Sequence, residues 1–428
     1  MSLLIVGLDI TALNVALPAL RDDLGASTSQ LQWIIDAYTV VMASLLTLMG
    51  STADRLGRRR TFLAGLTVFT AGSILCSLAP SSHTLIAFRA LQAIGAAALN
   101  PVAMSIVTNT FTDPRERAQA VGIWGAVFGV SMALGPIVGG ALVSAIGWEA
   151  IFWLNVPVGL AAIVLTLRFI PESKAEKPRR VDPVGQLIVI ALLASVTFGI
   201  IEESLPALGV AAVALVALLL YEPRREEPLI DLRFFGSIPF AASIAACVCA
   251  FAAFGGFLFL NTLYLQGEQG HSPVVAGLLT APVALMIVLA SPLSGRIVGG
   301  RGPRVPLLIA GACLTVGALI LTTHELLIVG YVVLGLGMGF VNAPITNAAV
   351  SGMPRAQAGV AAALATTSRQ VGQTLGVAVV GTLHHGAWWT LVVCGAAVLI
   401  LGAVATTSKA RESARRTAAA LNPEALAT

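Results

Sequence analysis

Hydrophobic runs of roughly twenty residues, separated by short stretches of Gly, Pro and charge, repeat along the whole chain. An α-helix needs a run of about 20 apolar residues to cross the hydrocarbon core of a bilayer. Dividing the chain at these interruptions predicts fourteen membrane-spanning helices. Their ranges are 3–20, 31–50, 61–79, 84–107, 118–143, 150–170, 184–201, 206–221, 238–262, 273–295, 305–323, 325–349, 357–382 and 387–406.

Composition supports a membrane protein over the full length of 428 residues. Hydrophobic residues make up 57% of the chain and charged residues 11%, with a mean hydropathy of +0.89. A soluble domain carries about 25% charge. An ordinary water-soluble enzyme, a disordered chain and a single-pass receptor are therefore excluded. The predicted fold class is an all-α polytopic membrane protein.

Basic residues sort to one side of the predicted membrane. Of the 25 Lys and Arg residues, 22 follow even-numbered spans, lie at the end of one (Arg168) or belong to the C-terminal tail. The exceptions are Arg21, Arg89 and Arg369. The positive-inside rule then places both termini in the cytoplasm, in a multi-pass protein of the cell membrane. Because this sorting accounts for the net charge of +4, no nucleic-acid partner is expected.

An internal repeat relates the two halves of the chain. The matches are Arg117-Ala-Gln-Ala with Arg355-Ala-Gln-Ala, Gly95 and Asn100 with Gly337 and Asn342, and Gly50 and Gly57 with Gly295 and Gly302. Such similarity indicates two parallel six-helix repeats. The predicted domains are an N-terminal bundle (1–170), cytoplasmic loops with two inserted helices (171–236), a C-terminal bundle (237–407) and a cytoplasmic tail (408–428).

The sequence lacks the residues that several kinds of chemistry require. No Gly-Lys pair occurs, so there is no Walker A motif, and the five histidines fall in or beside predicted outer loops. The five cysteines lie within apolar runs and are interpreted as packing residues. We therefore expect no metal, no cofactor and no enzymatic activity. Of the functions considered, these absences leave transport driven by a gradient of ions or of substrate.

The loop after the second span reads Gly50-Ser-Thr-Ala-Asp-Arg-Leu-Gly-Arg-Arg-Arg60. Its arginines can serve as positive-inside anchors, but that does not explain the acid or the glycine spacing. The loop resembles motif A of the major facilitator superfamily, a fold of two six-helix bundles, here with two extra helices. The resemblance implies that Gly50, Asp54, Arg55, Gly57 and Arg58 latch the two halves together on the cytoplasmic side.

The fifth span contains Gly125, Gly129 and then Gly135-Pro136-Ile-Val-Gly139-Gly140. Proline removes a backbone donor and glycines expose the main chain, so this helix can kink and pack closely against a neighbour. The pattern is similar to motif C, the antiporter signature of exporting branches of the same superfamily.

Two further segments resemble the fourteen-span drug:proton antiporters of EmrB/QacA type. One is the first-span segment from Leu8 to Pro18, and the other is the turn from Trp148 to Gly159. In the second, Glu149 and Ala150 replace an expected Arg-Trp pair.

Four ionisable residues within predicted spans stand out, and charge at membrane depth is a functional candidate by default. They are Asp9, Asp36, Arg89 and Arg369. Asp9 lies about 16 Å from the outer end of its helix, near the membrane midplane. Its carboxyl could hold either a proton or a cationic drug, or it could form a structural ion pair with Arg89 or Arg369. The resemblance associates Arg89 with proton coupling and Asp36 with an acid of quaternary-ammonium exporters.

Polar residues on the spans are candidates for lining a central cavity. On the thirteenth span they recur at helical spacing and form one stripe. Hydrogen bonding between helices is the alternative interpretation. The candidates are Asn14, Gln92, Asn100, Asn342, Thr346, Gln370 and Gln373.

These observations predict a proton-coupled antiporter that exports lipophilic drugs or antibiotics by alternating access. Its expected partners are a small lipophilic substrate, protons and the lipid bilayer, and it is expected to work as a monomer. The alternatives are a facilitative or uptake permease for a metabolite, a non-transporting membrane sensor and, with little support, an intramembrane enzyme. Two acids and two arginines leave the central cavity formally neutral, so charge does not indicate the substrate.

Overall fold

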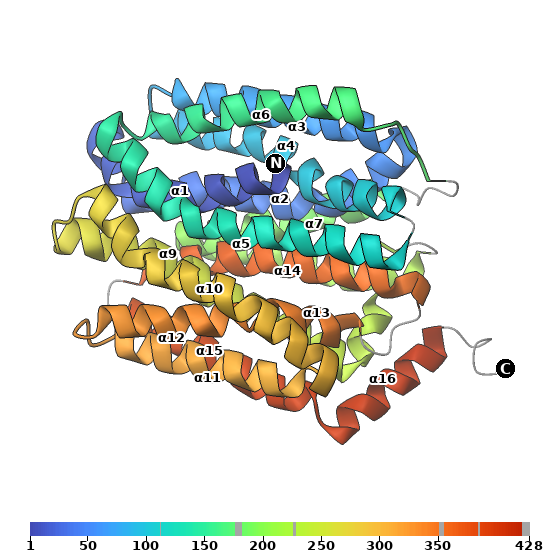
Figure 1. Ribbon diagram of the computed structural model, residues 1–428. Coiled ribbons are helices and arrows are strands. Elements are labelled where there is room, and N and C mark those ends of the chain that lie inside the picture. Colours follow the sequence, from blue (N-terminus) through green and yellow to red (C-terminus); the bar gives the residue numbers. More distant parts are fainter. Residues whose placement is uncertain (112, 176–181, 226–227, 351–354, 384–385, 422–428) are drawn as a thin grey trace. The chain divides into compact units, whose positions relative to one another are not determined.

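The computed structural model describes residues 1–111, 113–175, 182–225, 228–350, 355–383 and 386–421. Within these ranges, side chains are not described at Leu3, at many positions of 114–133, at 350, at 355–363 and at 420. Every regular element among the described residues is a helix (Figure 1).

The helices follow one another with short connections. The α-helices are α1 (Ser2–Leu24), α2 (Thr28–Leu56), α3 (Arg58–Ser77), α4 (Ser82–Thr110), α5 (Pro114–Ala145), α6 (Glu149–Phe169), α7 (Pro183–Ile201), α8 (Leu205–Tyr221), α9 (Ile238–Thr262), α10 (Pro273–Arg301), α11 (Arg304–Leu321), α12 (Leu327–Gly339), α13 (Asn342–Val350), α14 (Arg355–Thr382), α15 (Ala387–Ala405) and α16 (Ser408–Leu421). Shorter helical segments are η1 (Glu222–Arg224), η2 (Leu232–Gly236) and the π-helical η3 (Leu263–Glu268).

Twelve helical segments of the described residues are long and apolar enough to cross a membrane. They correspond to the predicted spans other than the fifth and the thirteenth. Those two positions hold α5 and α14, which run over residues that are not fully described. A multi-pass all-α protein is confirmed, and the count of fourteen stays a prediction.

The twelfth predicted span is interrupted. It is expected as one helix over 325–349, whereas α12 ends at Gly339 and α13 begins at Asn342. The N–H of Phe340 bonds to the carbonyl oxygen of Gly337 at 3.0 Å, which tightens the last turn. Glycine weakens a helix interior because it loses the most backbone freedom on folding. Gly335, Gly337 and Gly339 therefore favour an interruption here.

Polar side chains define where several helices begin. Ser27 accepts a hydrogen bond from the backbone N–H of Gln30, and the Gln30 side chain accepts one from the N–H of Ser27. This capping box satisfies two of the donors that the first turn of α2 leaves unpaired. Asp182 caps α7 in the same position and Ser81 caps α4.

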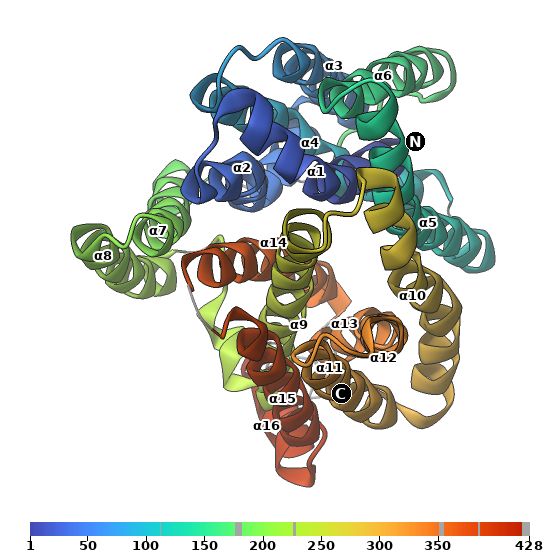
Figure 2. The same ribbon diagram turned by 90° about the vertical axis from the view of Figure 1, so that its left-hand side faces the viewer.

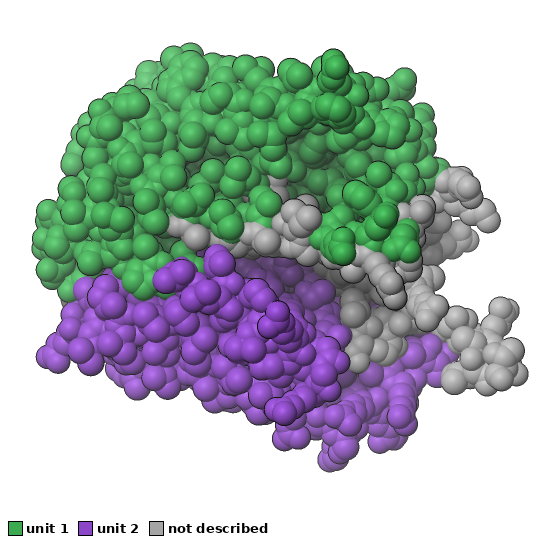
Figure 3. Space-filling view, viewed as in Figure 1, with its two compact units in different colours: residues 1–215, 258–284 green, residues 216–257, 285–428 purple. Residues whose placement is uncertain are grey.

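The chain divides into two compact units (Figure 3). Unit 1 comprises residues 1–215 and 258–284, and unit 2 comprises 216–257 and 285–428. The end of α9 and the start of α10 therefore group with the N-terminal helices. The predicted boundary at residue 237 follows the repeat, whereas this division follows packing.

Small residues bring the helices of unit 1 close together. A Cβ atom at Gly65 would lie 2.8 Å from that of Ala98, and one at Gly72 would lie 2.7 Å from the Cα of Gln92. Both positions are where α3 packs along α4, and contacts this short leave no room for a side chain.

The inserted helix α7 is attached to α2 near both of its ends. The Glu202 carboxylate accepts hydrogen bonds from Ser29 Oγ at 2.6 Å and from Trp33 Nε1 at 2.8 Å. Towards the start of α7, Gln186 Nε2 donates to the carbonyl oxygen of Ser44. Figure 2 shows α7 between α2 and α8.

In unit 2, α11 packs against α15 and α12 through glycines. A Cβ atom at Gly395 would lie 2.6 Å from the backbone nitrogen of Thr315, and one at Gly317 would lie 2.7 Å from that of Leu334. The C-terminal helix α16 packs on η2, where Ser413 Oγ accepts a hydrogen bond from the N–H of Ile238.

Candidate functional site

A hydrogen-bonded cluster around Asp9 joins four helices of unit 1. Arg89 Nη1 lies 2.5 Å from Asp9 Oδ2, and the same nitrogen donates to Gln92 Oε1 at 2.6 Å. The other carboxylate oxygen accepts from Gln92 Nε2 at 3.0 Å and from Asn155 Nδ2 at 2.8 Å. Gln92 Nε2 also donates to Ser73 Oγ at 2.7 Å. The cluster links α1 to α3, α4 and α6.

The ion pair is enclosed by protein. Asp9 and Arg89 are each 1% exposed. Arg89 Nε donates to the carbonyl oxygen of Ile34 at 3.2 Å, and its guanidinium lies 4.1 Å from the ring centroid of Tyr38. A buried ion pair needs such additional partners because removing two charges from water is costly. The sequence left Arg89 and Arg369 open as partners of Asp9, and the structure pairs Asp9 with Arg89.

Asn155 and Ser73 were not among the predicted site residues, although both bond within the cluster. Asn155 belongs to the segment quoted from the fifth-to-sixth turn, where it is one polar residue in an apolar helix. That exception to the hydropathy of α6 was the signal for it. Ser73 gives no comparable signal, because serines are common in membrane helices and bond to their own backbone.

Asp36 lies outside the cluster. Its side chain is fully buried on α2, and one carboxylate oxygen accepts a hydrogen bond from Thr39 Oγ1 at 3.3 Å. The other oxygen, Oδ2, is buried without a hydrogen-bond partner in the described structure. Asp36 is thus a second intramembrane carboxyl, and it accepts fewer side-chain hydrogen bonds than Asp9 does.

Among the predicted cavity residues of unit 1, Gln92 forms its hydrogen bonds within the Asp9 cluster. Asn14 donates from Nδ2 to the carbonyl oxygen of Ile10 at 2.8 Å. Its Oδ1 and that of Asn100 are buried without a hydrogen-bond partner among the described residues. These two amide oxygens can accept hydrogen bonds from a substrate or from water.

The predicted polar stripe in unit 2 forms a second group. Arg369 Nη2 donates to Thr346 Oγ1 at 3.2 Å, which joins α14 to α13. Within the described part of the unit, Asn342 Oδ1, Gln370 Oε1 and Arg369 Nε are buried without a hydrogen-bond partner. Gln373, the remaining candidate, is 6% exposed.

The loop between α2 and α3 is held by an acid that the sequence did not indicate. Oε1 and Oε2 of Glu172 accept hydrogen bonds from the backbone N–H groups of Arg59 at 3.1 Å and Arg60 at 3.2 Å. A carboxylate at the start of a helix satisfies unpaired donors and complements the helix dipole. The N–H of Arg58 also donates to the carbonyl oxygen of Ser173 at 2.9 Å. The segment after α6 therefore caps α3.

The other residues of the predicted motif differ in their surroundings. Asp54 pairs with Arg58 one turn later, at 3.0 Å. Arg55 is exposed, and Gly50 lies within α2 with a hypothetical Cβ in ordinary contact with Pro101. Gly57 has φ of 119°, a conformation that L side chains rarely adopt.

Replacing Gly57 by Ala is expected to destabilise this loop for two reasons. The backbone conformation costs about 1–3 kcal/mol for a residue other than glycine. In addition, the new Cβ would lie 2.6 Å from Glu172 Oε1. Thermal unfolding of the purified protein should show a lower Tm for G57A than for the wild type.

Gly25→Ala is the matched control, because Gly25 also has a positive φ (61°) but no atom within 4 Å of its hypothetical Cβ. Its loss of Tm should reflect backbone strain alone and be smaller. Equal losses in the two variants would show that neither the backbone conformation of Gly57 (ψ 136°) nor Glu172 constrains this loop more than the left-handed turn at Gly25 (ψ 32°) is constrained.

The glycines of α5 lie where other helices of unit 1 cross it. A Cβ at Gly135 would overlap Thr11 Oγ1 on α1, and one at Gly139 would lie 2.9 Å from the Cα of Ala12. A Cβ at Gly140 would overlap the carbonyl oxygen of Pro273 at the start of α10. Pro136 lies inside α5, and its carbonyl oxygen packs so close to Gly277 on α10 that a Cβ atom there would overlap it. Gly125 and Gly129 fall outside the residues whose surroundings are described.

No three His, Cys, Asp or Glu side chains of the described residues are grouped closely enough to hold a metal ion. The buried polar groups among the described residues include an ion-paired carboxyl and several amide oxygens. They can bind and release a proton or accept hydrogen bonds from a ligand.

The sequence matches that of known transporters. A family model described as Major Facilitator Superfamily matches residues 1–377. The chain is 36% identical over 398 residues to the multidrug resistance protein Stp of Mycobacterium tuberculosis (strain CDC 1551 / Oshkosh), covering 90% of this chain and 74% of that relative. It is 36% identical to the tetracenomycin C resistance and export protein of Streptomyces glaucescens, covering 89% of this chain and 73% of the relative.

Two further matches extend over most of the chain. The methylenomycin A resistance protein of Streptomyces coelicolor (strain ATCC BAA-471 / A3(2) / M145) is 34% identical, covering 95% of this chain and 90% of that relative. Among solved structures, the human organic anion transporter MFSD10 (TETRAN) superposes with a TM-score of 0.67, covering 95% of this chain and 98% of the other at 16% identity. That last match supports the fold alone.

Proposed function

This chain belongs to the Major Facilitator Superfamily, and we propose that it is a drug efflux pump that exchanges its substrate for protons. It is a transporter and not an enzyme. Relatives that match about nine-tenths of the chain at 34–36% identity are named for drug or antibiotic resistance and export. The observation that carries the coupling proposal is the buried Asp9–Arg89 ion pair, which is hydrogen-bonded to residues of α2, α4 and α6.

The proposed topology is that of the fourteen-span drug:proton antiporter branch. It adds α5 and α14 to the twelve long apolar helices, with α7 and α8 as the inserted pair. The basic loops and both termini face the cytoplasm in the cell membrane. The bundles are 1–170 and 237–407, joined by 171–236 and followed by the tail, 408–428.

Proton coupling follows from what holds the Asp9 cluster together. As a carboxylate, Asp9 accepts from Arg89, Gln92 and Asn155. A proton on Asp9 removes the charge that pairs with Arg89 and turns one acceptor oxygen into a donor. The bonds from α1 to α4 and α6 are then weakened. Protonation can thereby change the preferred arrangement of these helices.

We assign substrate binding to groups other than the Asp9 carboxyl. Direct competition between a proton and a drug at Asp9 would require the drug to displace donors that the carboxylate already has, from Arg89, Gln92 and Asn155. In unit 1, by contrast, the amide oxygens of Asn14 and Asn100 have no described hydrogen-bond partner and suit a ligand with donor groups. We therefore propose that the proton acts at Asp9 and that the drug contacts the amide groups.

Everted membrane vesicles test the direction and the coupling of transport. Their lumen corresponds to the cell exterior, so proton pumping makes it acidic. A proton-coupled exporter should accumulate drug in the lumen as protons leave. Tetracenomycin C and methylenomycin A are suitable first substrates, because relatives carry their names. Accumulation should exceed that of vesicles without the protein and should collapse when a protonophore is added.

Three outcomes would contradict the proposal. Drug that only equilibrates across the membrane would indicate a facilitative permease. Concentrative uptake that a protonophore leaves unchanged would show that protons do not drive export. Absence of transport over a panel of cationic, neutral and anionic antibiotics would favour a sensor.

A further inference from the structure

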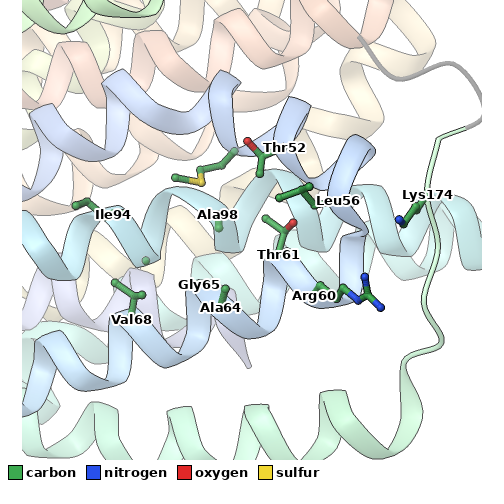
Figure 4. A pocket seen from close by; sticks show the side chains of 12 residues that line it. Thr52, Leu56, Arg60, Thr61, Ala64, Gly65, Val68, Ile94, Ala98 and Lys174 are labelled. Atoms are coloured by element: carbon green, nitrogen blue, oxygen red, sulfur yellow. The ribbon is translucent and has the colours of Figure 1, made fainter. Parts of the chain in front are cut away.

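An apolar groove opens on the surface of unit 1 near the loop between α2 and α3 (Figure 4). It has a volume of about 480 Å³ and is lined by residues of α2, α3 and α4 together with Lys174. Arg60 and Lys174 lie at one end of the groove in Figure 4, and Val68 and Ile94 lie towards the other end. The groove is separate from the Asp9 cluster, because the two share no lining residue.

Small residues create the floor of this groove. Gly65 on α3 packs against Ala98 on α4, where a Cβ at Gly65 would lie 2.8 Å from the Ala98 Cβ. Because neither residue has a side chain that extends outward, the space above them stays open. Ala64 is exposed at the groove and Ile94 is 40% exposed, so apolar surface faces outward here.

The length of the groove fits one leaflet of a bilayer. From Arg60 to Val68, α3 advances by about 12 Å at 1.5 Å per residue. Half of a hydrocarbon core measures about 15 Å. In the proposed topology, the loop between α2 and α3 faces the cytoplasm. The groove then covers most of the depth of the cytoplasmic leaflet.

The end of the groove near the loop is cationic. Arg60 and Lys174 both line it and both are exposed. The nearby acid is Glu172, whose carboxylate already accepts the backbone N–H groups of Arg59 and Arg60 and lies 3.6 Å from Arg60 Nε. The positive charges of Arg60 and Lys174 are therefore opposed by one carboxylate, Glu172, which already accepts hydrogen bonds at the start of α3. This end of the groove keeps an excess of positive charge.

We propose that this groove binds an anionic glycerophospholipid of the cytoplasmic leaflet. One acyl chain lies along the apolar floor, and the phosphate lies between Arg60 and Lys174. A cation at a membrane surface attracts anionic lipid, and an apolar groove of this depth receives hydrocarbon. A cationic drug is the less suitable occupant, because it would meet two positive charges at the entrance. The inference goes beyond drug export, and of the proposed function it rests only on the topology.

Native mass spectrometry of the delipidated, full-length protein tests this inference. The protein in detergent is titrated with palmitoyl-oleoyl phosphatidylglycerol or with the zwitterionic phosphatidylcholine of the same chains. The charge variant is R60Q/K174Q, and the groove variant is A64F, which places a ring over the floor. The matched control is K409Q/R411Q, which removes two exposed basic charges on α16 in unit 2.

The wild type and the control should retain phosphatidylglycerol in preference to phosphatidylcholine. Each basic residue near an anionic surface contributes roughly fivefold, so R60Q/K174Q should reduce that preference about 25-fold. A64F should weaken retention of both lipids, because it obstructs the acyl chain. Phosphatidylglycerol cross-linked through a photoreactive acyl chain should label peptides of α2 and α3.

Other results would overturn the inference. The wild type could show no preference for phosphatidylglycerol, or the charge variant and the control could lose it equally. Labelling of these same peptides by a photoreactive drug, prevented by A64F and unaffected by phosphatidylglycerol, would show that the groove admits substrate instead.

Discussion

We expect Asp9→Asn to abolish proton-driven drug accumulation in everted vesicles while the protein still inserts into the membrane. Asparagine occupies a similar volume and can still accept a hydrogen bond from Asn155, but it cannot bind and release a proton. The variant also leaves the Arg89 guanidinium buried without its carboxylate. Breaking a buried ion pair by removing one partner costs about 3–5 kcal/mol, so the Tm should fall as well.

The double variant D9N/R89Q separates coupling from structure. Removing both charges eliminates the unpaired guanidinium, so most of the lost stability should return. Transport should remain absent, because the titrating carboxyl is still missing. Recovery of both stability and proton-driven transport would show that the pair is only structural. Glu203→Gln makes the same chemical change at an exposed turn and should leave both measurements near wild type.

The second large effect is expected at the crossing of α1 and α5. Gly135→Val places a branched side chain where even a Cβ would overlap Thr11 Oγ1. Overpacking of a close helix contact costs about 1–3 kcal/mol or more. If α5 must move along α1 during transport, the variant should lose most of its drug export. Initial rates in everted vesicles, normalised to the amount of inserted protein, measure this loss.

Gly209→Val is the matched control on α8, where nothing lies within 4 Å of the hypothetical Cβ. It should export at near the wild-type rate. A smaller change, Gly135→Ala, should be partly rescued by Thr11→Ala, because that change removes the overlapping hydroxyl. Normal export by G135V would show that close packing at this crossing is dispensable.

Hydropathy was enough to predict the multi-pass helical architecture. Each helix in a bilayer must satisfy its own backbone and present apolar side chains, so its signal lies within about 20 consecutive residues. The interruption at Phe340 was missed, because hydropathy does not register how three glycines weaken a helix. The motif of Gly50, Asp54 and Gly57 could also be read locally, since these residues lie close together in the chain, at the end of α2 and just after it.

The residues that complete the sites come from distant parts of the chain. Glu172 is more than a hundred residues from the helix that it caps, and Asn155 is 146 residues from Asp9. Nothing in the neighbourhood of either residue identifies its partner. Hydropathy marks a polar residue in an apolar helix as unusual, but it does not indicate which other helix that residue faces.

The amino-acid sequence by itself determined that this protein crosses the membrane many times, which superfamily it resembles and which few charges lie at membrane depth. Those properties depend on the composition of single helices and loops. Only the tertiary structure decided that Asp9 pairs with Arg89, that the pair is enclosed, and that small residues leave a groove beside Arg60. Pairing and enclosure depend on which helices are neighbours, because desolvation and hydrogen bonding act between side chains in contact, however far apart they are in the chain.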